Sequence, residues 1–221
     1  MTILDTLAFM RSGLRKPRQV MSGSWEERQA IVTEDVNLFC WNRPAYPTIT
    51  TYLEKMLARP TRPITSHVQL ETLDASISSA KSEWNLNNDD GCDIFWEDVA
   101  RLTRDFLSFA NDRSGTIHLK VIDNDSCTKF HTDGYTLRLF TTYYGKGTEW
   151  LPEQAVNRSG LGKSNELIVK DPKQVKRMDA FEVGILKGEV PKRNSGVKGI
   201  VHRSPSISHL GEKRIIFRID I

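Results

Sequence analysis

The sequence predicts a mainly β protein with a helical N-terminal part, and three observations lead to this fold class. The second half of the chain contains short runs of β-branched and aromatic residues, separated by turns rich in glycine and proline. The first half contains segments in which apolar residues recur every three or four positions, as in helices that bury one face. No apolar run approaches the roughly 20 residues of a membrane span. This pattern leaves open whether the strands form a sandwich or a barrel.

The pattern changes near residue 114, and we divide the chain there. Residues 1–113 are expected to form helices and loops that pack on a β core made by residues 114–221. The 221 residues are enough for one core with a helical annex, so we expect one compact unit.

Four segments of the first half are expected to be helical. Ser24 can cap a helix that begins at Trp25. The clearest amphipathic pattern covers residues 93–111, where Asp93 can cap the helix and one face is apolar. The other two expected helices cover residues 48–57 and 70–84.

Five segments of the second half are expected to be strands. In the first of them Ile117, Leu119 and Val121 alternate with polar residues, so these three share one face. The expected strands cover residues 116–122, 137–144, 180–186, 199–202 and 214–221.

Composition limits the classes of partner. The chain has 31 basic and 28 acidic residues, a net charge of +3, which is too balanced to indicate binding to nucleic acid or to a membrane. Three widely spaced cysteines do not form a disulfide framework, and the N-terminus lacks a secretory signal pattern. We therefore expect a cytoplasmic protein that binds neither nucleic acid nor membrane; the oligomeric state stays open.

The candidate chemistry begins with the sequence Phe130-His131-Thr132-Asp133. On an extended strand, residues two apart point to the same side, so His131 and Asp133 converge. His202 follows a short β-like run 69 residues later. Two histidines and one carboxylate on one side of an ion leave its other positions open, which is the arrangement of non-haem iron(II) oxygenases. The alternative is a histidine in a turn with a capping aspartate.

Other polar residues are candidates for binding cosubstrate or substrate. Arg214 and Arg218 share one face of the last strand, and the planar fork of an arginine suits a carboxylate. The alternative is that both arginines lie on the surface of an edge strand. Three further residues are candidates for binding the cosubstrate or for lining the pocket mouth: Thr142, Arg203 and Arg138. Arg138 can instead form an ion pair with Asp133. Tyr144 is a candidate substrate contact, because one Thr/Tyr pair of residues 141–144 must face inward.

The spacing of these residues resembles the 2-oxoglutarate- and iron(II)-dependent oxygenase superfamily. H-x-D, a distal histidine and an arginine 12 residues later follow in the same order, and residues 211–218 resemble the closing strand of taurine dioxygenase-type members. The resemblance implies a double-stranded β-helix, or jelly roll, flanked by helices. It also implies that Arg214 holds 2-oxoglutarate, that Arg218 faces the substrate, and that Fe(II) and O2 complete a reaction that hydroxylates a small molecule.

A second resemblance is more specific. The motifs FHTD, TYYGKGTEWLP, LKGE and HRSP together resemble an uncharacterised bacterial family known as domain of unknown function 1826. Members of that family occur in zinc-responsive gene neighbourhoods, which keeps two alternatives open. One is a non-catalytic, cupin-like metal-binding protein linked to zinc homeostasis, and the other is an iron oxygenase that uses no keto-acid.

Overall fold

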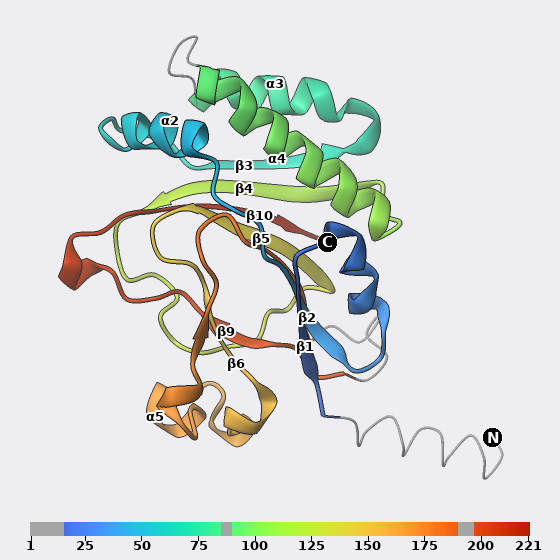
Figure 1. The fold of residues 1–221 in the computed structure, drawn as a ribbon, viewed down its shortest axis with the longest axis vertical. Coiled ribbons are helices and arrows are strands. Elements are labelled where there is room, and N and C mark those ends of the chain that lie inside the picture. The colour runs from blue at the N-terminus through green and yellow to red at the C-terminus, as the bar shows by residue number, and fades with distance from the viewer. Residues whose placement is uncertain (1–15, 85–89, 190–196) are drawn as a thin grey trace, which may run out of the picture.

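The described strands form two sheets in the structure, which is a computed structural model describing residues 16–84, 90–189 and 197–221 (Figure 1). The larger sheet has seven described strands in the order β1-β2-β8-β5-β10-β4-β3. Only β1 and β2 pair in parallel; the other neighbours are antiparallel. Its strands are β1 (Arg18–Ser22), β2 (Val36–Trp41), β3 (Ile64–Gln69), β4 (Ser114–Ile122), β5 (Leu137–Tyr144), β8 (Val183–Lys187) and β10 (Arg214–Asp220).

The smaller sheet has three described strands in the order β7-β6-β9, all antiparallel. They are β6 (Glu149–Leu151), β7 (Lys176–Arg177) and β9 (Val201–Arg203). Figure 1 shows β6 and β9 on the side of the large sheet that the long helices leave uncovered, with α5 (Asn165–Ile168) beyond them. The two sheets therefore lie on either side of a shared interior.

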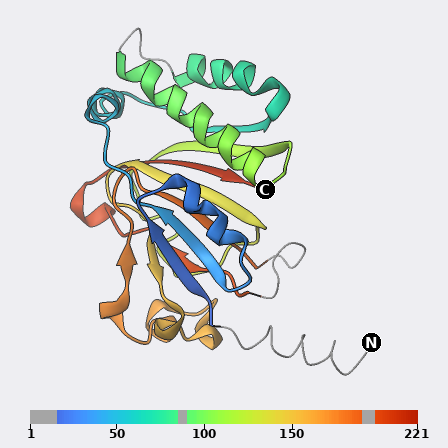
Figure 2. The same cartoon turned by 45° about the vertical axis from the view of Figure 1, so that its right-hand side comes forward.

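The long helices cover the other face of the large sheet, and both views place α3 and α4 over β3 and β4 (Figures 1 and 2). The helices are α2 (Pro47–Leu57), α3 (Leu73–Trp84) and α4 (Asp90–Phe109). In α4, the ring of Phe95 packs edge-on against Tyr143 of β5 at 4.9 Å between centroids. The Tyr143 hydroxyl donates to Asp98 at 2.6 Å, and Arg43 pairs with the same buried carboxylate at 2.7 Å. Large apolar contacts and one satisfied ionic cluster thus hold α4 on the sheet.

The predicted elements of the second half are confirmed, with shifts of up to three residues at their ends. Residues 180–186 were expected as one strand, but β8 begins at Val183 because residues 180–182 form a turn with Phe181 at φ +71°. β9 and β10 occupy the positions predicted for residues 199–202 and 214–221.

The expectation of only helix and loop before residue 114 is wrong, because β1, β2 and β3 belong to the large sheet. All residues of β2 except Trp41 are buried, so its run VNLFCW lacks the alternation by which a half-buried strand is recognised. β3 lies at the edge of the sheet, and only Ile64 and Val68 among its residues are buried. Neither pattern distinguishes strand from loop in the sequence.

The helices are confirmed, with differences at their beginnings. The expected helix at residues 70–84 begins with the 3-10 turn η2 (Leu70–Thr72) and continues as α3. The segment after Ser24 is the 3-10 helix η1 (Trp25–Val32), and Ser24 accepts from the Glu26 N–H as a cap. α4 begins at Asp90, so Asp93 lies inside the helix and is not its cap.

The remaining 3-10 turns lie in the second half: η3 (Glu153–Ala155), η4 (Arg158–Gly160), η5 (Pro172–Gln174) and η6 (Ser208–Leu210). Within the described part of the chain, no helix has both the length and the apolar composition needed to cross a membrane.

Candidate metal centre

His131, Asp133 and His202 come together in the fold. One potential ligand atom from each side chain lies within 4.8 Å of the other two. The backbones of His131 and His202 form an antiparallel bridge, with N–H to carbonyl distances of 3.0 and 2.9 Å. This bridge places the two imidazoles on the same side of two neighbouring segments of the chain, with ring centroids 4.6 Å apart. The predicted convergence of distant residues is therefore present in the structure.

Hydrogen bonds orient both imidazoles toward the same point. Nδ1 of His131 lies 2.8 Å from the Lys129 carbonyl, and Nδ1 of His202 lies 3.2 Å from the Ile200 carbonyl. A carbonyl can only accept, so Nδ1 carries a proton in each ring and Nε2 is the atom left to bind a metal. These Nε2 atoms lie 3.8 and 3.4 Å from the Asp133 carboxylate. The donor set is one that a divalent transition metal prefers.

Arg138 forms a hydrogen-bonded ion pair with the Asp133 carboxylate. Its Nη1 donates to Oδ2 of Asp133 at 2.6 Å, which leaves Oδ1 facing His131. Its Nε donates to Asp220 Oδ1, so one buried guanidinium bridges two buried carboxylates. The sequence offered this pairing with Asp133 as one of two roles for Arg138.

Burial differs between the two histidines. The His131 side chain is 38% exposed, whereas His202 is buried. Burial, together with the neighbouring His131, lowers the pKa of His202 to about 4, although Asp133 opposes the shift. His202 is therefore neutral at pH 7, with its Nε2 lone pair available.

A cavity of about 270 Å³ opens beside the two histidines. Its walls come from β4, β5, β8, β9 and β10 and from the segment before His131. Five of the lining side chains are basic, and none of the described lining residues is acidic. The basic residues are Lys120, Arg138, Arg203, Arg214 and Arg218.

Arg214 presents an unused donor to this interior. Its side chain is 1% exposed, and its Nε donates to the Lys146 carbonyl. Its Nη2 lies 3.3 Å from the hydroxyl of Thr142, which also lines the cavity. The remaining Nη1 is buried and has no hydrogen-bond partner in the described structure. Burial lowers the pKa of Arg214 to about 10, so the group stays charged at pH 7.

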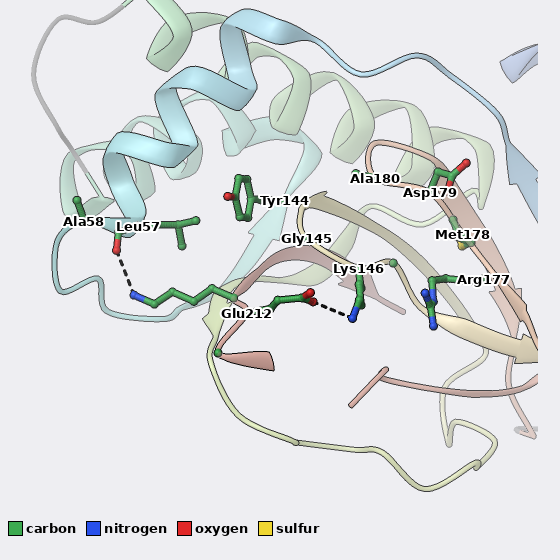
Figure 3. Close-up of a pocket in the computed structure, with 13 residues that line it drawn as sticks. Leu57, Ala58, Tyr144, Gly145, Lys146, Arg177, Met178, Asp179, Ala180 and Glu212 are labelled. Atoms are coloured by element: carbon green, nitrogen blue, oxygen red, sulfur yellow. Dashed lines mark hydrogen bonds and ion pairs between the residues drawn. The ribbon is translucent and has the colours of Figure 1, made fainter. Parts of the chain in front are cut away.

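Tyr144 does not reach this cavity. In the register of β5 with β10, Thr142 pairs with Ile216 and Tyr144 with Ile215, so Tyr143 is an extra, unpaired residue. Such a bulge breaks the alternation on which the prediction for Tyr144 relied. Tyr144 lines a separate cavity of about 780 Å³, beside the ion pair of Lys146 with Glu212 (Figure 3). We therefore do not retain Tyr144 as a substrate contact.

Arg203 and Arg218 both line the cavity. Arg203 donates to the buried Glu149 at 2.7 Å and lies 4.3 Å above the Phe130 ring. Burial acts to raise the pKa of Glu149, but hydrogen bonds from Arg177 and Arg203 outweigh it and lower that pKa. The charge of Arg203 is thus compensated inside the protein.

Sequence reasoning missed Lys120 and Asp220. Both lie on the cavity side of predicted strands, opposite the apolar residues that defined those strands. Strict alternation from Ile117, Leu119 and Val121 places Lys120 on the other face, so a signal for it existed. The partner of Asp220, Arg138, lies on a neighbouring strand and could not be found from spacing.

Comparison with known proteins adds a family and a fold. A family model described as "Protein of unknown function (DUF1826)" matches residues 25–220. No curated protein matches the chain in sequence. Among solved structures, the chain is similar to the dioxygenase for auxin oxidation of rice, with a TM-score of 0.56, 10% identity, and 93% of this chain and 82% of that chain covered.

It is also similar to AtDAO1, dioxygenase for auxin oxidation 1 from Arabidopsis thaliana, in a binary complex with 2-oxoglutarate. The TM-score is 0.51 at 8% identity, with 92% of this chain and 91% of that chain covered. At such low identity the likeness establishes a shared fold and leaves the activity to be argued from the site.

Proposed function

We propose that this chain, which belongs to the DUF1826 family, is an Fe(II)- and 2-oxoglutarate-dependent oxygenase that acts on a small molecule in the cytoplasm. The observation that carries the proposal is the convergence of His131, Asp133 and His202 beside a cavity that contains an unpaired arginine donor. The shared fold with dioxygenases supports it, as does the presence of 2-oxoglutarate in one of those structures. We further propose that the two facing sheets form a double-stranded β-helix.

The residues present fit such a centre. Nε2 of His131, Nε2 of His202 and Oδ1 of Asp133 would hold the metal, because their other polar atoms are already hydrogen-bonded. A structural zinc site would be filled by four protein ligands, and the described residues supply three here. When bound, iron(II) with 2-oxoglutarate and O2 supplies the oxidising chemistry.

Arg214 and Thr142 would hold the far carboxylate of 2-oxoglutarate. The free Nη1 of Arg214 needs an acceptor, since a buried donor without one is costly. The Thr142 hydroxyl, 3.3 Å from Arg214 Nη2, can donate to the same carboxylate. Arg138 fixes the Asp133 carboxylate and so keeps one oxygen directed at the metal position.

The proposal is tested by anaerobic titration with Fe(II) and 2-oxoglutarate. An oxygenase of this kind develops a weak visible metal-to-ligand absorption band when the keto-acid binds. We expect Arg214→Gln to retain Fe(II) but to lose the band at wild-type 2-oxoglutarate concentrations. Arg59→Gln, which changes an exposed arginine on another part of the chain, serves as the matched control.

The alternatives give different results. Tight Zn(II) binding with no band in the wild-type protein would favour a non-catalytic metal-binding protein. Oxygen consumption by Arg214→Gln at the wild-type rate, without keto-acid, would favour an oxygenase that uses none.

A further inference from the structure

The cationic lining of the cavity carries an inference about the substrate, which rests on the proposed function. Of its five basic side chains, Arg138 is bonded to Asp133 and Asp220, and Arg203 is bonded to Glu149. Arg214 is assigned above to the keto-acid. The two others, Lys120 and Arg218, are half-buried and line the cavity together with the exposed residues Ser126 and Cys127.

Lys120 and Arg218 are neighbours on adjoining strands. In the register of β4 with β10, Lys120 pairs with Ile216, and His118 pairs with Arg218. Lys120 and Arg218 are therefore diagonal neighbours on one face, about 7–8 Å apart between backbones, which long side chains easily span. Both side chains line the same cavity, so one bound group can contact both.

Their charges are weakly compensated. Lys120 makes no ion pair or hydrogen bond through its side chain among the described residues. Nε of Arg218 lies 3.3 Å from Asp220 Oδ2, but it forms no hydrogen bond there and is buried. Asp220 is also bonded to Arg138 and lies 3.3 Å from His118, so one carboxylate faces three basic side chains.

Loading the centre does not remove this excess of positive charge. A divalent ion and the doubly negative 2-oxoglutarate cancel each other, so the balance of the protein's side chains is unchanged. A cavity lined by charge of one sign attracts ligands of the opposite sign and raises their local concentration. The excess therefore remains for the substrate.

We propose that Lys120 and Arg218 form an anion subsite that binds a carboxylate or phosphate group of the substrate. The guanidinium of Arg218 offers a planar fork for two oxygens, and the ammonium of Lys120 adds a mobile point charge. The cavity volume of about 270 Å³ limits the substrate to a small molecule or to one end of a larger one.

The test measures binding of acetate and of inorganic phosphate to the full chain by calorimetry at constant ionic strength, in chloride buffer. We expect Arg218→Gln to weaken binding of the preferred anion about tenfold and Lys120→Gln to weaken it several-fold. Lys163→Gln, which changes an exposed lysine, should leave it unchanged. Tighter acetate binding would identify a carboxylate substrate, and tighter phosphate binding a phosphate ester.

The subsite and the proposed function fail in different ways. Absence of the anaerobic absorption band defeats the keto-acid assignment but leaves the anion titrations interpretable. The subsite is refuted if neither anion binds, or if binding is unaffected by Lys120→Gln and Arg218→Gln. It is also refuted if the only substitution that weakens anion binding is Arg214→Gln, because the anion would then occupy the keto-acid position.

Discussion

Substitution of Arg138 by glutamine removes a positive charge that bridges two buried carboxylates. Asp133 and Asp220 are only 8% and 5% exposed, and Arg138 donates to both. Breaking a buried ion pair by removing one partner costs about 3–5 kcal/mol, because the remaining charge stays in a poorly solvated place. Total stabilities are about 5–15 kcal/mol, so we expect loss of a large fraction of the free energy of unfolding.

The loss should depend on pH in a defined direction. Burial acts to raise the pKa of Asp220, but His118 and Arg138 outweigh it and hold the pKa below its ordinary value. A carboxyl with a lowered folded-state pKa stabilises the protein above its unfolded pKa, about 3.9, and the contribution disappears as the pH falls through the folded value. The difference between wild type and Arg138→Gln should therefore be largest near pH 7 and should narrow toward pH 3.

Urea unfolding of the metal-free proteins, followed by tryptophan fluorescence, measures this difference. Arg101→Gln is a matched control: Arg101 pairs with Asp98 at the same 2.6 Å, but its side chain is 40% exposed. Asp98 keeps its bonds to Arg43 and Tyr143 when Arg101 is replaced, so loss of this half-exposed partner should cost only about 0–1 kcal/mol. Equal losses for the two variants, or a difference for Arg138→Gln that does not narrow in acid, would refute the reasoning.

Two further predictions concern the same region. The pKa of His202 is lowered to about 4 in the folded state, so the unfolded chain binds a proton first as the pH falls. The metal-free protein should therefore lose on the order of 3 kcal/mol of its free energy of unfolding between pH 7 and pH 4. His202→Asn should flatten this part of the stability curve, and an unchanged curve contradicts the assignment. Gly188→Ala should lower the free energy of unfolding by roughly 1–3 kcal/mol and weaken Mn(II) binding, because the added Cβ would lie 2.1 Å from the Tyr135 carbonyl oxygen and 2.5 Å from that of Asp133. If calorimetric titration finds wild-type affinity for Mn(II), this contact does not position Asp133.

The convergence of His131 and Asp133 could be predicted because it depends on local geometry. Two residues two apart on an extended segment face one side whatever the rest of the fold does, so His131 and Asp133 follow from the sequence. The pairing of His202 with His131 is a contact across 71 residues, and no periodicity predicts it. His202 is a candidate because it follows a short β-like run, and its position after H-x-D resembles the order of residues in the 2-oxoglutarate- and iron(II)-dependent oxygenase superfamily.

The rest of the site depends on details that alternation does not contain. A single extra residue in β5 places Tyr144 in another cavity, while Thr142 remains in the predicted one. The strands of the first half are hard to predict for a related reason: β2 is buried on both faces and lacks alternation, and β3 alternates in burial but has apolar side chains only at Ile64 and Val68. Tertiary burial, which the sequence does not display, decides their conformation.

A crystal structure of the full chain grown with Fe(II) and 2-oxoglutarate under anaerobic conditions tests the central claim most directly. We expect one metal ion bonded at about 2.0–2.2 Å by Nε2 of His131, Nε2 of His202 and one oxygen of Asp133, with the keto-acid in the open positions and its far carboxylate on Arg214. A metal held by four protein ligands, or bound elsewhere with these three side chains unliganded, would contradict the account.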